Sequence, residues 1–125
     1  LNRADGTFDP TSHGEVDAIR DACRKLQVTN LGGADMYTSG EPCSMCVATM
    51  YQAGIKRLFY AGAASDSAAF FDRLAEHDPK WARSMTNQEL REEVGRPMEQ
   101  RQMPAEQLMV DDIVEVFEAF IARHT

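Results

Sequence analysis

Apolar side chains recur at helical spacing near both ends of the chain. In residues 13–26 they form one stripe, which consists of Val16, Ile19, Ala22, Cys23 and Leu26. Thr11 or Ser12 can cap this helix, because a short hydroxyl side chain accepts from the first free N–H groups. Residues 111–123 open with two aspartates and share an apolar face of Ile113, Val116, Phe117, Phe120 and Ile121. We therefore predict an amphipathic helix in each segment.

Between these two helices the pattern changes to strand, helix and strand. Runs typical of strands, 34–39 and 57–61, lie on either side of residues 43–53. Pro42 suits the first position of a helix, and Gly54 stops it. We expect its inward side chains to be Val47, Met50 and Tyr51. This order predicts two parallel strands in an α/β fold.

The remaining segments carry weaker signals. Residues 1–12 contain Asp-Gly and Asp-Pro turns and predict a loop. Residues 67–76 and 87–94 predict helices, with breaks at Asp78-Pro79 and at Arg96-Pro97. Because no internal repeat or linker interrupts the chain, we interpret residues 1–125 as a single domain.

Composition narrows the class of protein. With 125 residues, 43% hydrophobic and 26% charged, the chain is typical of a globular domain that buries a core. No apolar run approaches the roughly 20 residues of a membrane helix, and residues 1–6 show no signal-peptide pattern. We therefore expect a cytoplasmic location. The net charge of −7 disfavours binding to nucleic-acid phosphates and favours a small-molecule substrate.

The cysteines and one histidine predict a metal site. Cys43 and Cys46 lie three residues apart at the start of a helix, so both sulfurs point to one side. His13 adds an imidazole from a second helix start, and three protein ligands leave the open position of a catalytic zinc ion. A structural site needs a fourth ligand, for which the candidates are Cys23, His77 and His124. They belong to an apolar stripe, a loop and a chain end, so we expect none to bind.

Glu15 is the candidate catalytic residue, two positions after His13. Zinc lowers the pKa of water to roughly 7 and so supplies hydroxide. A nearby carboxylate that does not bind the metal can take the proton and return it to a substrate. These residues therefore fit the hydrolysis of an aromatic ring amine, with release of ammonia.

The chain resembles the cytidine deaminase-like superfamily, within it the branch of bacterial guanine deaminases and tRNA adenosine deaminases. Residues 9–20, DPTSHGEVDAIR, resemble the run DPTAHAEVxAIR of that branch, with Gly14 in place of alanine. Residues 37–46, YTSGEPCSMC, resemble its run YTSxEPCPMC, and residues 58–61 are similar to the next strand of guanine deaminases. The motifs lie within residues 2–61, about half of the chain.

The resemblance implies a three-layer α/β fold, with a mixed β-sheet between helices and zinc between two helix N-termini. An N-terminal helix and two antiparallel strands precede the H-x-E helix in the family, and we expect this chain to lack them. Asn2 matches an asparagine that hydrogen-bonds the substrate base. In guanine deaminases an aspartate after the last strand and an aromatic side chain from the dimer partner close over the base. Asp72 is the candidate aspartate, and we expect a homodimer.

The substrate stays open at this point. We favour a purine or related amino-heterocycle, first guanine converted to xanthine, because residues 59–61 and 92–104 resemble guanine deaminases. Isocytosine, aminotriazines and purine nucleosides are alternatives, since no tyrosine follows Tyr60 and the segment around Trp81 has no counterpart there. Trp81 could cap the pocket or anchor a surface.

Two further hypotheses concern other kinds of function. The first is a tRNA-editing adenosine deaminase, which predicts salt-sensitive binding of an anticodon stem-loop. The second is a non-enzymatic, zinc-stabilised interaction module, for which Glu15 would be dispensable.

Overall fold

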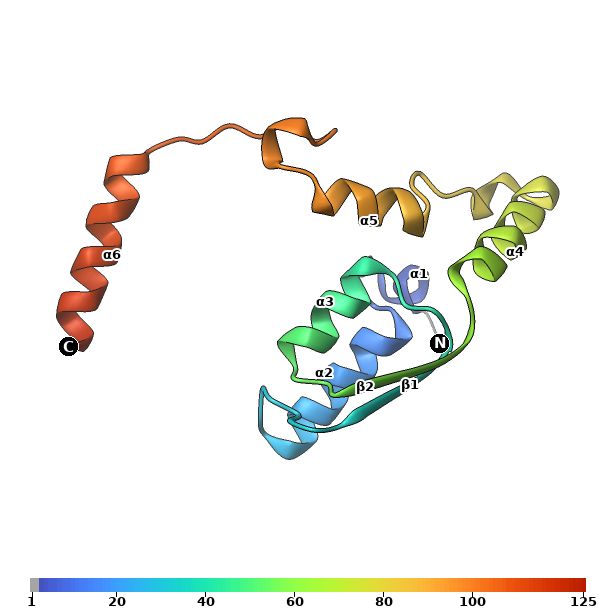
Figure 1. Cartoon of the computed structure of the whole chain (residues 1–125), viewed down its shortest axis with the longest axis horizontal. Coiled ribbons are helices and arrows are strands. Elements are labelled where there is room, and N and C mark those ends of the chain that lie inside the picture. Colours follow the sequence, from blue (N-terminus) through green and yellow to red (C-terminus); the bar gives the residue numbers. More distant parts are fainter. Residues whose placement is uncertain (1–2) are drawn as a thin grey trace. The chain divides into compact units, whose positions relative to one another are not determined.

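A strand, a helix and a second strand follow one another in residues 35–62 of a computed structural model, which describes residues 3–125 (Figure 1). β1 (Asp35–Gly40) and β2 (Arg57–Gly62) pair in parallel, with Met36 opposite Leu58. α3 (Ser44–Gln52) connects them. The predicted strand–helix–strand unit is thus confirmed. These two strands form the whole sheet within residues 3–125, so the antiparallel strands of a mixed sheet are not among the residues described.

The apolar core lies between α2 (Gly14–Leu26), α3 and β1. Its buried side chains come from these three elements and from the residue after α3, and are Val16, Ile19, Met36, Cys46, Met50 and Ala53. Burying a large aliphatic side chain contributes about 1.5–3 kcal/mol, so this small cluster is the main stabilising contact of the region. The predicted stripe of α2 is confirmed at its two buried positions, Val16 and Ile19.

The other face of the sheet carries aromatic and charged side chains. Because side chains alternate along a strand, the neighbours of Met36 and Leu58 point away from the core. Tyr37 and Phe59 stack there, with ring centroids 4.8 Å apart and the planes at 15°. Beside them Arg57 donates two hydrogen bonds to the carboxylate of Asp35. This face therefore carries one aromatic pair and one ion pair, each formed between β1 and β2.

Gly54 ends the region of α3, as the sequence predicts. Its φ is +75°, a left-handed conformation that side chains with a Cβ rarely adopt. A Cβ at this position would lie 2.6 Å from Oδ1 of Asn30. The backbone conformation therefore favours glycine, while the side chain of Asn30 could move away from a Cβ, and the chain turns here into β2.

The other elements follow the prediction with one exception. The predicted helices correspond to α4 (Ala64–His77), α5 (Asn87–Gly95) and α6 (Val110–His124), and short 3-10 turns occupy Pro79–Trp81 (η1) and Met98–Gln100 (η2). The exception is α1 (Ala4–Thr7), a single turn inside the segment predicted as a loop. Phe8, in the left-handed conformation, closes that turn. Among residues 3–125, no helix combines the length and apolar character needed to cross a membrane.

Contacts divide the chain into two compact units, Leu1–Glu92 and Glu93–Thr125. In the second unit, Arg101 donates to the carbonyl oxygens of Val94 and Arg96, which ties the turn η2 to the end of α5. The apolar side chains of α6 are exposed in this structure. The single domain expected over residues 1–125 stays a prediction.

Tyr51 is placed differently from the prediction. Its side chain is 81% exposed, whereas that of Met50 is 5% exposed. Successive helical residues point about 100° apart, so an apolar run does not place all its members in the core. The prediction for Met50 is confirmed and that for Tyr51 is wrong.

This difference gives a direct test of where the core lies. Met50→Ala should lower the free energy of unfolding by about 2–4 kcal/mol, because it leaves a cavity among well-packed side chains. Tyr51→Ala, the neighbouring substitution, should change it by less than about 1 kcal/mol. Urea unfolding followed by circular dichroism measures both. An equal loss of stability in the two variants would contradict this placement of the core.

Candidate active site

The turn before α2 positions His13 at the N-cap of that helix. The carboxylate of Asp9 accepts from the backbone N–H and the hydroxyl of Thr11, at 2.9 and 2.7 Å. The buried hydroxyl of Ser12 donates to Asp17 at 2.8 Å, and this hydrogen bond lowers the pKa of the Asp17 carboxyl. The predicted cap at Thr11 or Ser12 is therefore wrong. Both hydroxyls hold the turn instead of capping the helix.

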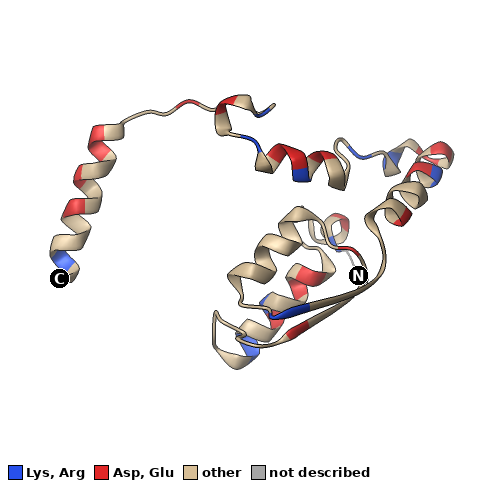
Figure 2. Ribbon diagram, viewed as in Figure 1, with Lys and Arg blue, Asp and Glu red and all other residues tan. Residues whose placement is uncertain are grey.

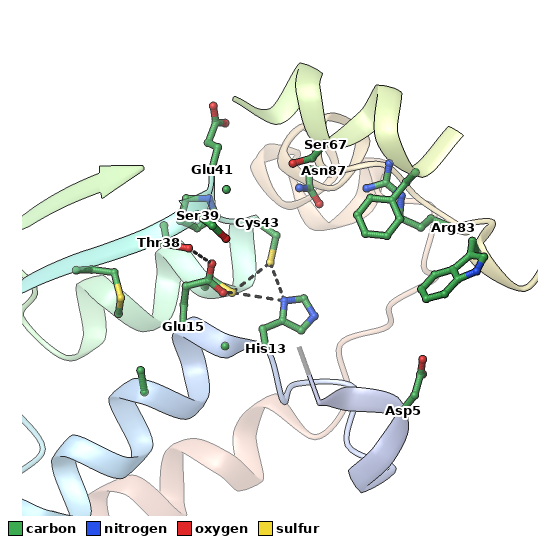
Figure 3. A pocket seen from close by; sticks show the side chains of 18 of the residues that line it. Asp5, His13, Glu15, Thr38, Ser39, Glu41, Cys43, Ser67, Arg83 and Asn87 are labelled. Atoms are coloured by element: carbon green, nitrogen blue, oxygen red, sulfur yellow. Dashed lines mark hydrogen bonds between the residues drawn. The ribbon is translucent and has the colours of Figure 1, made fainter. Parts of the chain in front are cut away.

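The start of α3 brings two sulfur atoms to the same place. Cys43 is the N-cap residue and Cys46 lies in the first turn, so their Sγ atoms are 3.6 Å apart. The Nδ1 atom of His13 lies 3.6 Å from Sγ of Cys43 and 3.5 Å from Sγ of Cys46 (Figure 3). All three donor atoms lie within 4.8 Å of one another, and together they could hold a metal ion. None of Cys23, His77 and His124 belongs to this cluster in the described part of the chain.

The two thiols differ strongly in acidity. The pKa of Cys43 falls to about 5, chiefly because it forms a hydrogen bond with Cys46, with a further contribution from the charge of His13. The same hydrogen bond raises the pKa of Cys46, and burial and the carboxylate of Glu15 raise it further. One thiolate therefore forms readily, while a second needs a positive charge beside it. A divalent cation between the two sulfurs supplies such a charge.

Glu15 lies beside this cluster, held by a threonine. The hydroxyl of Thr38 in β1 donates to Oε1 of Glu15 at 2.7 Å, and Oε2 lies 3.5 Å from Sγ of Cys46 (Figure 3). The sequence interpretation missed Thr38. Strand alternation could have found it, because Thr38 is two residues after the buried Met36 and points to the same face.

A cavity of about 680 Å³ opens beside Glu15 and the three donor side chains. Its volume lies in the range of about 300–1,000 Å³ that is typical of small-molecule sites. The sequence interpretation did not predict most of its further lining, which comes from α4, η1 and the residues up to the start of α5. These residues include Ser67, Phe71, Lys80, Trp81, Arg83 and Asn87. Trp81 thus lines the cavity, and its side chain is 40% exposed.

The two predicted substrate contacts are not brought to the cluster. Asn2 lies outside the residues that the structure describes. Asp72 lies on α4 with an exposed side chain and is not among the residues that line the cavity, although its neighbour Phe71 is. His13, Glu15, Cys43 and Cys46 are therefore the predicted site residues that the fold brings together.

Comparisons with known proteins agree with this arrangement. The model of the MafB19-like deaminase family matches residues 1–104. Guanine deaminase of Bacillus subtilis is 34% identical over 120 residues, which cover 95% of this chain and 68% of that protein. The X-ray structure of a guanine deaminase from Bacillus subtilis superimposes with a TM-score of 0.79 at 31% identity, over 97% of this chain and 69% of the other.

A second group of relatives matches a shorter region. The tRNA-specific adenosine deaminase of Agrobacterium fabrum is 39% identical over 82 residues. The match covers 61% of this chain, which spans about half (54%) of that relative. Both groups agree with the resemblance to the cytidine deaminase-like superfamily, and the structural match confirms the α/β fold class. On these findings, the chain belongs to the MafB19-like deaminase family.

Proposed function

We propose that this protein hydrolyses the exocyclic amine of a purine or related amino-heterocycle, first guanine, and releases ammonia. One observation supports the proposal above the others. The carboxylate of Glu15, fixed by Thr38, lies beside a cluster of one imidazole and two thiols at the edge of a cavity. The match to guanine deaminase, over 95% of the chain, favours guanine among the candidate rings.

The donor set fits zinc held by His13, Cys43 and Cys46. With bonds of about 2.3 Å to sulfur and about 2.0 Å to nitrogen, neighbouring donors of a tetrahedral zinc ion lie about 3.5–3.8 Å apart. The three separations between the donor atoms here are 3.5, 3.6 and 3.6 Å. Because the protein offers three donors, a zinc ion held by them would keep one position open for water. When bound, zinc would lower the pKa of water and supply the nucleophile near neutral pH.

Glu15 moves the protons of the reaction. Its carboxylate takes a proton from the attacking water and passes it to a ring nitrogen. A second transfer protonates the departing amino group. The carbon–oxygen bond forms and the carbon–nitrogen bond breaks, so that a ring amine and water become a ring carbonyl and ammonia.

Thr38 is a positioning residue for Glu15. A carboxylate on a flexible side chain must point at the water and at the ring nitrogen in turn. The hydroxyl of Thr38, on strand β1, restrains one oxygen, Oε1, while Oε2 lies toward the donor cluster, 3.5 Å from Sγ of Cys46, and is the oxygen that transfers the proton. β1 thus contributes to both the core, through Met36, and the catalytic group, through Thr38.

A tRNA-editing adenosine deaminase is the second candidate, supported by the relative from Agrobacterium fabrum. The charge of the chain disfavours it, since phosphate binding needs clustered Lys and Arg. The net charge is −7, and acidic positions are distributed over α4, α5 and α6 (Figure 2). Other small rings and a non-enzymatic zinc module stay alternatives. The homodimer, the cytoplasmic location and the base contacts of Asn2 and Asp72 remain predictions.

Replacing Glu15 tests the function itself. Glu15→Gln should lower the rate of ammonia release by about 10²–10⁴-fold, because the amide cannot accept the proton. The measurement is an ammonia-release screen over guanine, isocytosine, aminotriazines, nucleosides and an anticodon stem-loop. Glu76→Gln, at an exposed position of α4 outside the cavity, is the matched control and should keep the wild-type rate. If the zinc-loaded wild-type protein hydrolyses none of these amines, the proposed function is wrong.

Metal analysis tests the ligand set. The wild-type protein should bind roughly one zinc ion per chain, and Cys43→Ala should lose it, because two donors bind zinc weakly. Cys23→Ala removes a thiol outside the cluster and should retain the metal. Plasma emission spectroscopy on purified protein measures both. Retention of zinc by Cys43→Ala, or equal loss in Cys23→Ala, would exclude this ligand set.

Thr38 can be tested with two substitutions of similar size. Thr38→Val removes the hydroxyl and should lower kcat by about 10–100-fold, the usual effect of losing a hydrogen bond to a charged group. KM should change little, because the hydroxyl contacts Glu15 and is not proposed to contact the substrate. Thr38→Ser keeps the hydroxyl and should restore most of kcat. A purely structural role would instead lower the melting temperature and leave the serine variant no better than the valine variant.

A further inference from the structure

One wall of the cavity is formed by a segment that the proposed chemistry does not use. Lys80, Trp81 and Arg83 follow Asp78, in and just after the turn η1. In Figure 3, Glu15 and Arg83 lie on opposite sides of the view. A ring whose reacting edge is at Glu15 therefore has its opposite edge toward this segment. These residues are therefore placed to contact the part of a substrate that does not react.

Of the two charged side chains of this wall, one is paired. Nζ of Lys80 lies 3.3 Å from the carboxylate of Asp78. For Arg83, no carboxylate lies within ion-pair distance among residues 3–125. Arg83 thus brings to the cavity a positive charge that is not ion-paired, while the carboxylates of Asp5, Glu15 and Glu41 line the cavity at other points.

The environment of Arg83 holds its guanidinium in place. The group lies over the ring of Phe71, 4.7 Å from the centroid, and the residue is half-buried. An aromatic face attracts a guanidinium, but it does not accept hydrogen bonds from the N–H groups in the way a carboxylate does. The five donors of arginine are matched to the paired oxygens of a carboxylate or phosphate. A guanidinium that is held in place and has no ion-pair partner is therefore suited to bind an anionic ligand.

We propose that Arg83 binds an anionic substituent of the substrate, so that the substrate class is an amino-heterocycle bearing a carboxylate or a phosphate. This inference rests on the proposed function, because it concerns the same cavity. The ring would lie between Glu15 and the aromatic side chains of Phe71 and Trp81, with the anion at Arg83. The volume of about 680 Å³ accommodates a ring together with such a substituent.

Matched pairs of substrates test this specificity. Guanosine is compared with guanosine 5′-monophosphate for the phosphate arm, and isocytosine with its 6-carboxylate for the carboxylate arm. In at least one arm the anionic member should have a kcat/KM about tenfold or more above the neutral member, and this advantage should shrink at high salt. The arm that shows the advantage identifies the anion.

Substitutions at Arg83 assign the effect to this residue. In Arg83→Gln the ratio of kcat/KM between anionic and neutral members should fall toward one, and Arg83→Lys should keep part of it. Arg24→Gln removes an exposed arginine outside the cavity and should keep the wild-type ratio. Circular dichroism melting shows whether each variant folds, and the salt dependence of the wild-type ratio needs no variant.

Binding can be measured separately from catalysis. Trp81 is the only tryptophan of the chain and lines the cavity, so its fluorescence reports occupancy. Titration with the unreactive products xanthosine and xanthosine 5′-monophosphate, and with uracil and its 6-carboxylate, should show tighter binding of an anionic member. Arg83→Gln should abolish that difference.

The outcomes separate this proposal from the proposed function. Turnover of neutral rings without an anionic advantage in either arm overturns the role of Arg83 and leaves the deaminase intact. An anionic preference that persists in Arg83→Gln also overturns it. If no ring is hydrolysed, the proposed function fails, and the fluorescence titration decides whether Arg83 binds anions.

Discussion

Cys46 belongs to two structures at once, the apolar core and the cluster of donor atoms. Its side chain is 1% exposed and packs with Val16 and Met50, while its sulfur lies 3.5 Å from Nδ1 of His13. The two helix starts must therefore meet within a few ångströms of a well-packed region. Since packed interiors yield little to distortion, the core and the donor geometry constrain one another. Stability and chemistry depend on the same contact between α2 and α3.

The chemical part of the site could be predicted from the sequence because its spacing is local. Cys43 and Cys46 lie within one helical turn, and His13 and Glu15 lie within another, so a helix start determines each pair. The strand–helix–strand unit was predictable for a similar reason, because Pro42 and Gly54 mark the limits of its helix. Each of these features depends on contacts among close neighbours in sequence.

The features that the sequence interpretation missed depend on contacts between distant segments. Thr38 meets Glu15 across 23 positions, and it does so only because β1 lies beside α2. Tyr51 was predicted to face inward, but it faces away from the core although its helix contributes to that core. Phe71 and Arg83 reach the cavity through the path of the chain after β2, where the sequence signals are weaker. The turn at His13 was mispredicted because the hydroxyls of Thr11 and Ser12 found carboxylate partners.

The residues of the proposed chemistry and those of the proposed specificity lie on different parts of the fold. The donor cluster and Glu15 lie on helix starts that are fixed by the core, and Thr38 ties the carboxylate to a strand of the same unit. Trp81 lies in the short turn η1 and Arg83 lies just after it, and their side chains are exposed and half-buried, respectively. Substitutions in such a segment cost little stability, because few core contacts are lost. On the proposed function, substitutions in this segment can thus change which ring enters the cavity while Glu15 and the donor cluster stay in place.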